Sequence, residues 1–184
     1  MWDRLALVRL LIIGLCALLC GLSVPARAAD DDPASRVKAV FVYNFAQFVR
    51  WPKSMPSDVF KVGALGKSAI VKPLKEIAKV KKAAGMPLDV TVFGDKDKIE
   101  PCRILIVPKN RASEIDSLRD SLEMQHVLLV GDGLKQAGEG SAINFVVVDG
   151  KLRFEVSQNA LRRAGLTASA HLLRLALLVD TDDD

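Results

Sequence analysis

The stretch CRILIVPKNRASEIDSLRDSLEMQHVLLVGDG, residues 102–133, contains two apolar runs separated by an amphipathic segment. The runs at 102–108 and 126–130 are short and continuous, which is typical of strands buried on both faces. Residues 112–123 have the periodicity of an amphipathic helix. A strand, a helix and a second strand in this order predict a parallel sheet that helices cover.

Three segments that precede this unit continue the alternation. They are a strand at 60–65 (FKVGAL), a basic helix at 71–84 (VKPLKEIAKVKKAA) and a strand at 88–93 (LDVTVF). Near the start, Pro33 suits the first turn of a helix and Asp32 suits its N-cap, so we expect a helix from about 33 to 50. This helix should end at Trp51, because a residue before proline disfavours the helical conformation.

The pattern changes after residue 142. INFVVVDGKLRFEV (143–156) holds two alternating runs around Asp149-Gly150, which predicts a two-residue β-hairpin. The remaining predicted elements are a short helix at 158–164, between Ser157 and Gly165, and a last helix at about 168–179. The predicted fold is therefore a single α/β domain, with a mixed, mainly parallel central sheet, helices on both faces and a C-terminal antiparallel hairpin.

Residues 1–28 have the features of a cleaved secretory signal. Two arginines precede an apolar run over residues 10–22, and Ala26-Arg27-Ala28 provides an A-x-A cleavage site. The alternative is an uncleaved membrane anchor, which needs about 20 apolar residues and therefore a longer run. Cleavage would leave one domain, residues 29–184. It would lower the formal net charge from +4 to +2, because residues 1–28 carry three arginines and one aspartate. A charge so close to zero argues against a nucleic-acid partner.

The remaining chain has no recognisable catalytic or metal-binding motif. GALGKS (63–68) follows a predicted strand, but the P-loop frame would need a glycine at Lys61, so a plain strand-to-helix turn is the simpler interpretation. There is no GxSxG motif, and His126 and His171 stand in no catalytic frame with serine or cysteine. Two distant histidines and one cysteine give no metal-ligand spacing. We therefore expect no enzymatic activity, no cofactor and no metal.

Cys102 is the one cysteine that would remain after cleavage, so it has no internal disulfide partner. The apolar run that follows it favours a small buried side chain, and a disulfide between two chains is the alternative.

Gly131-Asp132-Gly133 follows a predicted strand, at the edge where open α/β sheets bind ligands. One interpretation is a turn in which Asp132 caps a short following helix. Another is a small-ligand pocket formed by Asp132 and Gly133. A carboxylate pair of Asp132 and Glu155 would suit glycoside hydrolysis, but no feature of the sequence links these two residues.

Two predicted helices carry more apolar surface than one sheet face can cover. In the helix that ends at Trp51, Asn44 lies inside the apolar arc, so we expect its amide to be buried and hydrogen-bonded to a loop or a neighbouring backbone. Core packing and an exposed docking patch both account for this arc. In the last helix, apolar side chains point around nearly the whole circumference. The residues expected to contact a partner there are Leu172, Leu173, Arg174, Leu175, Leu177 and Leu178.

Four segments together resemble the YfiR family of exported bacterial proteins. They are VKAVFVYNFAQFVRWP (37–52), the CRILIV strand, the HVLLVGDG turn and INFVVVDGKLRFEVSQNALRRAGLTASAHLLRLA (143–176). The resemblance implies a periplasmic, non-enzymatic α/β regulator. Such a regulator binds the periplasmic sensing part of an inner-membrane diguanylate cyclase and represses it, which lowers cyclic di-GMP signalling and biofilm formation.

The resemblance also implies two further partners, an outer-membrane lipoprotein that sequesters the regulator and a second copy in a homodimer. Cys102 resembles one of the paired cysteines of the family, but this chain has no second cysteine after residue 28. Two other functions stay open at this point. One is a periplasmic small-ligand receptor that uses Asp132 and Gly133, and the other is an exported hydrolase.

Overall fold

The computed structural model describes residues 32–52, 57–122 and 125–179, and the predicted signal peptide lies outside these ranges. The helices are α2 (Pro33–Phe48), α3 (Val71–Val80), α4 (Ile115–Leu122), α5 (Gln158–Arg163) and α6 (Ala170–Leu175), with 3-10 helices η2 (Lys96–Lys98) and η3 (Lys109–Glu114). The strands are β1 (Val49–Arg50), β2 (Phe60–Leu65), β3 (Lys82–Ala83), β4 (Met86–Phe93), β5 (Ile104–Pro108), β6 (Leu128–Asp132), β7 (Ile143–Val148), β8 (Lys151–Val156), β9 (Thr167–Ala168) and β10 (Leu177–Leu178).

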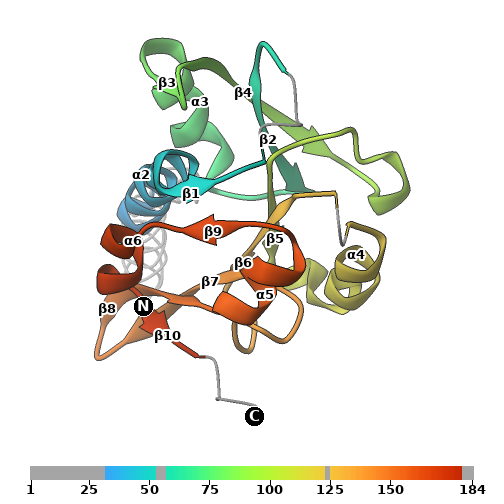
Figure 1. Cartoon of the computed structure of the whole chain (residues 1–184). Coiled ribbons are helices and arrows are strands. Elements are labelled where there is room, and N and C mark those ends of the chain that lie inside the picture. The colour runs from blue at the N-terminus through green and yellow to red at the C-terminus, as the bar shows by residue number, and fades with distance from the viewer. Residues whose placement is uncertain (1–31, 53–56, 123–124, 180–184) are drawn as a thin grey trace, which may run out of the picture.

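The main sheet has the strand order β10-β8-β7-β6-β5-β2-β4-β3 (Figure 1). From β7 to β4 all neighbours are parallel, whereas β8 is antiparallel to β7 and β3 is antiparallel to β4. If the five parallel strands are numbered along the chain, their order is 2-1-3-4-5, which is one of the common doubly wound arrangements. The predicted mixed, mainly parallel sheet is therefore confirmed.

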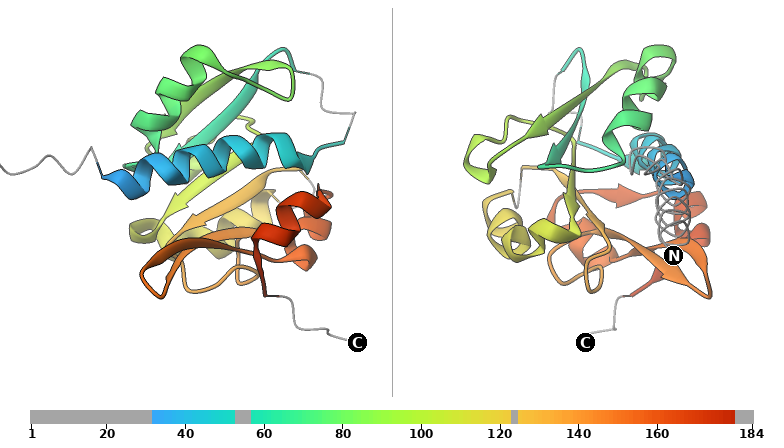
Figure 2. Two further views of the ribbon diagram at one scale, coloured as in Figure 1. Left: turned by 90° about the vertical axis from the view of Figure 1, so that its left-hand side faces the viewer. Right: turned by 180° about the vertical axis from the view of Figure 1, so that it is seen from behind.

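Helices cover both faces of the sheet, as expected. One face packs against α2, α3 and α6, and its core extends from Ala39 to Leu172. The other face packs against α4 through a smaller core that includes Leu105, Ile115 and Leu118. The views in Figure 2 show α2 lying along the middle of its face, with α3 on one side of it and α6 on the other.

A cluster of four phenylalanines, two on α2 and two on the β7-β8 hairpin, buries part of the broad apolar arc of α2. Phe45 is fully buried, and its ring centroid lies 5.8 Å from that of Phe145 and 5.2 Å from that of Phe154. Phe41 lies 5.2 Å from Phe154. Phe145 and Phe154 are directly opposite each other in the β7-β8 hairpin, so this cluster joins the first helix to the hairpin. Aromatic pairs at these separations stabilise a core beyond the area that they bury.

The C-terminal segment covers the end of α2. Ser169 donates its backbone N–H to the carbonyl of Phe48, β9 pairs antiparallel with β1, and the His171 ring lies 4.8 Å from the Phe48 ring. The chain then forms α6 and adds β10 to the sheet beside β8. The two ends of the domain are therefore packed against each other.

The hairpin and most strands agree with the sequence predictions. Asp149 and Gly150 both have positive φ, at 50° and 71°, as the favoured two-residue hairpin turn requires. Asp32 caps α2, Ser157 caps α5, and Gly165 follows α5 with a φ of 67°.

Three helix ends were predicted wrongly. The expected helices at 33–50, 71–84 and 168–179 stop early, and residues 49–50, 82–83 and 177–178 are instead two-residue strands. Each of these strands exists because a partner strand provides its hydrogen bonds. The partners of β1 and β10 lie far along the chain, where a local sequence pattern does not include them. The partner of β3 is residues 86–87, directly after a turn at Ala84-Gly85 that the helix prediction missed.

Candidate functional site

Exposed apolar side chains gather on the elements that begin the strand order of the main sheet. Four of the large exposed ones lie there, on β7, α6 and β10: Val147 (71%), Val148 (42%), Leu175 (53%) and Leu178 (53%). We call these four residues the apolar end. Others lie elsewhere, among them Val40 on α2 and Val80 at the end of α3. The strands β10, β8 and β7 are consecutive neighbours in the sheet, so the residues of the apolar end lie on one side of the domain (Figure 1).

The hairpin extends beyond the body of the sheet. Strand β6 pairs with β7 only at residues 143–145, so Val146, Val147 and Val148 pair with β8 alone. Val147 lies opposite Leu152 and, by the alternation of side chains, on the same face as Phe145. The apolar pattern of the core thus continues along the hairpin into solvent. Single exposed valines are ordinary, but a group on adjacent elements is typical of an interaction surface.

The leucines of the last segment have different environments, because helix α6 ends at Leu175. Leu172 is 2% exposed and belongs to the core, whereas Leu173 and Leu177 are half-buried. Leu175 and Leu178 are the ones available to a partner. The expectation that all five leucines lie on one helix is therefore wrong. Arg174 is exposed beside them and makes no ion pair with the residues that the structure describes.

Asp132 forms an ion pair inside the domain. Its Oδ1 lies 2.6 Å from Lys38 Nζ of α2, and both side chains are about four-fifths buried. The same ammonium lies 6.0 Å from the centroid of the Phe145 ring. No helix follows Asp132 in residues 133–142, so the predicted helix cap is wrong. Gly133 donates its N–H to the carbonyl of Phe145 and has a φ of 76°.

A buried polar network on the other face was missed from the sequence. Asn144 is fully buried, its Oδ1 accepts from Leu134 N at 3.0 Å, and its Nδ2 donates to Leu134 O at 3.1 Å and to Glu155 Oε2 at 3.1 Å. The same Glu155 oxygen accepts from Ala137 N at 3.0 Å. This network fixes the 133–142 loop to the hairpin. Glu155 therefore bonds to Asn144 and Ala137, and not to Asp132 as the carboxylate pair considered above would require. One signal was available, an asparagine at a buried position within a run of apolar residues.

Asn44 does not have the environment expected of it. It is half-buried, and its side chain makes no hydrogen bond with the described part of the chain. The neighbouring Tyr43 Oη and Gln47 Nε2 donate to the Lys82 carbonyl at 3.3 and 3.0 Å. Trp51 is half-buried and packs edge-on against Phe60, with ring centroids 5.2 Å apart.

Cys102 is buried in the smaller core, and it is not disulfide-bonded. Burial raises the pKa of its thiol to about 12, although a hydrogen bond with the Gly63 backbone and the charge of Lys61 oppose this change. A thiol that remains protonated is a poor nucleophile. Its surroundings are those of a structural residue.

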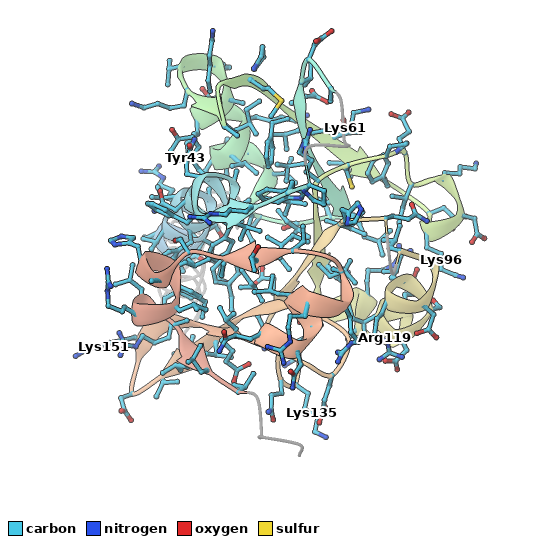
Figure 3. The ribbon with its side chains drawn as sticks, in the orientation of Figure 1. Tyr43, Lys61, Lys96, Arg119, Lys135 and Lys151 are labelled. Carbon is cyan, nitrogen blue, oxygen red and sulfur yellow. The ribbon has the colours of Figure 1, made fainter. Side chains whose placement is uncertain are left out.

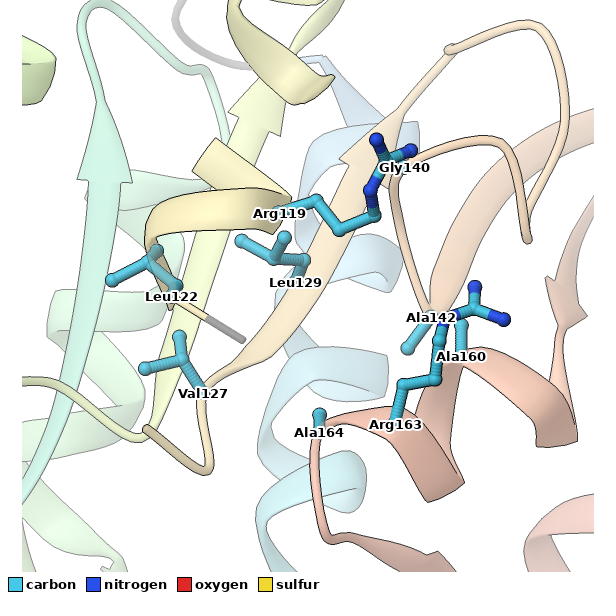
Figure 4. A pocket seen from close by; sticks show the side chains of 9 residues that line it. All are labelled: Arg119, Leu122, Val127, Leu129, Gly140, Ala142, Ala160, Arg163 and Ala164. Atoms are coloured by element: carbon cyan, nitrogen blue, oxygen red, sulfur yellow. The ribbon is translucent and has the colours of Figure 1, made fainter. Parts of the chain in front are cut away.

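The cavity shown in Figure 4 is too small for a metabolite. It lies between α4 and α5, has a volume of about 30 Å³, and is lined mainly by apolar side chains with Arg119 and Arg163 at its edge. Ligand pockets usually enclose about 300 to 1,000 Å³. A groove of about 390 Å³ between α2 and α3 falls within this range, and its lining residues are Asp32, Ser35, Arg36, Val40, Lys72, Pro73, Glu76 and Ile77. Asp132 and Gly133 line neither cavity.

Within the described ranges, no group of three or more His, Cys, Asp or Glu side chains could hold a metal ion. No helix in that part of the chain has the length and apolar character needed to cross a bilayer. A sequence profile of the YfiR/HmsC-like family matches residues 35–177, which is more than half of the chain.

The chain belongs to the YfiR/HmsC-like family. No curated protein matches its sequence at a significant level. The family match covers all the strands and helices described above except the first two residues of α2 and the last residue of β10. Membership in this family supports a coarse assignment, a regulator in diguanylate cyclase signalling.

Proposed function

We propose that this protein is a periplasmic, non-enzymatic regulator that binds the periplasmic sensing part of an inner-membrane diguanylate cyclase and holds the cyclase inactive. The family supports the signalling role, and the exposure of Leu175 and Leu178 beside the projecting hairpin carries the choice of surface. A regulator of this kind acts through a difference in affinity for two states of its partner.

The apolar end supplies the contact area of the proposed interface. Leu175 and Leu178 bury apolar surface against the cyclase, as does Val147, whereas Val148 points to the opposite face of the hairpin. Arg174 is an exposed residue of α6 and orients a partner carboxylate or carbonyl, for which a guanidinium is well suited. The buried Leu172 supports this surface from inside and contacts no partner.

The experiment measures binding of the purified cyclase sensor domain and cyclic di-GMP production in cells. The double substitution Leu175→Asp and Leu178→Asp should abolish binding and release the cyclase, while the melting temperature stays close to that of the unmodified chain. Val59→Asp is a matched control, because Val59 is also exposed but lies immediately before β2, outside the apolar end. Intact repression by the double variant would refute the proposed surface.

The same surface suits the two other partners that the family resemblance implies. A lipoprotein that sequesters the regulator would compete with the cyclase for the apolar end, and a second copy would cover it in a homodimer. Analytical ultracentrifugation of the Leu175→Asp variant tests whether a second copy covers this surface. A dimer that dissociates in the variant supports a self-associating surface, whereas an unchanged dimer places self-association elsewhere.

The groove between α2 and α3 favours a second candidate function, small-ligand binding. Its size and its lining of both apolar and charged side chains fit a small amphipathic metabolite. A thermal-shift screen tests this function: stabilisation that Val40→Trp removes would support it, and no stabilisation across a periplasmic metabolite panel would count against it.

A further inference from the structure

The positive charge of the protein is concentrated in one short segment. Residues 67–82 contain six lysines and one glutamate, a formal charge of +5. Because the whole chain carries +4, the charges of all other residues add up to −1. The segment comprises the loop after β2, helix α3 and the first residue of β3. The six residues of this lysine surface are Lys67, Lys72, Lys75, Lys79, Lys81 and Lys82, and all are exposed.

The fold holds these lysines on the outer side of α3. Lys72, Lys75 and Lys79 are three and four residues apart, so they lie on one face of the helix. The opposite face carries Leu74, which is fully buried against the sheet and α2. The bonds of Tyr43 and Gln47 to the Lys82 carbonyl fix the end of the segment. The lysine surface is therefore presented by a rigid element.

Little negative charge offsets this surface locally. Glu76 is the single acidic residue of the segment, and it pairs with Lys79 at 2.8 Å. The other five lysines of the surface have no ion pair with the described residues. Clustered unpaired charges repel one another, so their accumulation at one place is typical of a surface that binds a polyanion.

Two further features of the segment favour an anionic lipid bilayer over other polyanions as its ligand. Val80 is 78% exposed between Lys79 and Lys81, so the cationic surface also presents an apolar side chain. The segment contains lysine and no arginine, and the lysine ammonium is a flexible point charge that suits mobile headgroups better than fixed bidentate partners. A groove of about 310 Å³ beside Lys67, Lys72 and Lys75 has room for a headgroup phosphate, although Glu76 also lines it.

We propose that the lysine surface binds the headgroup surface of an anionic phospholipid membrane, without insertion of a helix into the bilayer. The surface lies at the end of the sheet where β3 is the last strand, and the apolar end lies where β10 is the first. Figures 1 and 2 show α3 and the β7-β8 hairpin on opposite sides of the domain. A molecule bound in this way directs its apolar end away from the bilayer, towards the protruding domain of a membrane protein.

The test uses the chain from Ala29 onwards, because the described residues of both cores lie between Ala39 and Leu172. It is mixed with vesicles of phosphatidylcholine alone and with vesicles of phosphatidylcholine and phosphatidylglycerol in equal amounts, and bound protein is measured by co-sedimentation. We expect binding to the anionic vesicles only, and a decrease as sodium chloride is raised. The triple substitution Lys72→Gln, Lys75→Gln and Lys79→Gln should weaken binding about 100-fold, at about fivefold for each lysine.

A matched control replaces Lys96, Lys98 and Lys135 with glutamine, which removes the same charge from η2 and from the loop after β6 (Figure 3). This control should retain binding within about twofold, since these lysines lie outside the lysine surface. Equal losses in both variants would show a general charge effect and overturn the proposal. So would equal binding to pure phosphatidylcholine, no binding to the anionic vesicles, or displacement by sodium phosphate beyond that by sodium chloride at the same ionic strength.

Discussion

Replacing Asn144 with leucine should destabilise the domain strongly, although the two side chains have similar size. The substitution removes three hydrogen bonds at once, and it leaves the N–H and the carbonyl of Leu134 without their side-chain partner in a buried site. Each unsatisfied buried group costs about 1 to 3 kcal/mol, so the free energy of unfolding should fall by about 2 to 6 kcal/mol. This is a large part of the about 5 to 15 kcal/mol typical of a domain.

Urea unfolding followed by circular dichroism measures this loss, with the midpoint expected to move and the slope to stay constant. Asn44→Leu is the matched control, because Asn44 is half-buried without a side-chain hydrogen bond, so its replacement should change stability by less than about 0.5 kcal/mol. Amide exchange provides a local readout, since the N–H groups of Leu134 and Ala137 are donors in the network.

If Asn144→Leu does not fold, Asn144→Asp tests the same network. It retains the acceptor for Leu134 N but places a second carboxylate beside Glu155, which raises the pKa of one of the pair. The destabilisation should therefore decrease as the pH falls and the pair takes up a proton. A loss below about 1 kcal/mol in Asn144→Leu, with unchanged exchange at Leu134, would refute the structural role of the network.

Three other predictions follow from individual contacts. Lys38→Met should lower the free energy of unfolding by about 1 to 3 kcal/mol because it leaves Asp132 unpaired, and the further change Asp132→Leu should restore part of that loss. Urea unfolding of the two single variants and the double variant measures the coupling, and losses that simply add would contradict it. Gly150→Ala should cost about 1 kcal/mol in the same assay, because its φ of 71° is strained for alanine although space is open; no loss would contradict this account. Cys102 should resist iodoacetamide at about pH 8 until the chain unfolds, since its thiol pKa is raised to about 12. Fast labelling of the folded chain would contradict the raised pKa. Because that pKa lies above the ordinary value of 9.0, the stability contribution of the neutral thiol is present below about pH 9 and is lost as the pH rises towards 12.

The sequence predicted the elements whose signal is local. The hairpin at Asp149-Gly150 needed only its turn residues and the alternation around them, and strand β2 was predicted with its observed ends, 60–65. The family resemblance also came from continuous segments, and the family match over 35–177 confirms it.

What the sequence could not predict depends on partners far along the chain. Leu177 and Leu178 have good helix propensity, but β8 provides hydrogen bonds that make them a strand. The same holds for the ion pair of Lys38 with Asp132, whose members are 94 positions apart. Exposure of the apolar end follows from these long-range contacts, so the candidate surface required the structure.

The packing of the last segment over the first helix constrains when the domain can fold. Phe48 receives its cover from β9 and α6, more than a hundred residues later in the chain. A ribosome must therefore release almost the entire polypeptide before the larger core can close, and contacts of such separation form slowly. Until then the nascent chain remains open and accessible to chaperones, which is the condition that a translocase requires of its cargo.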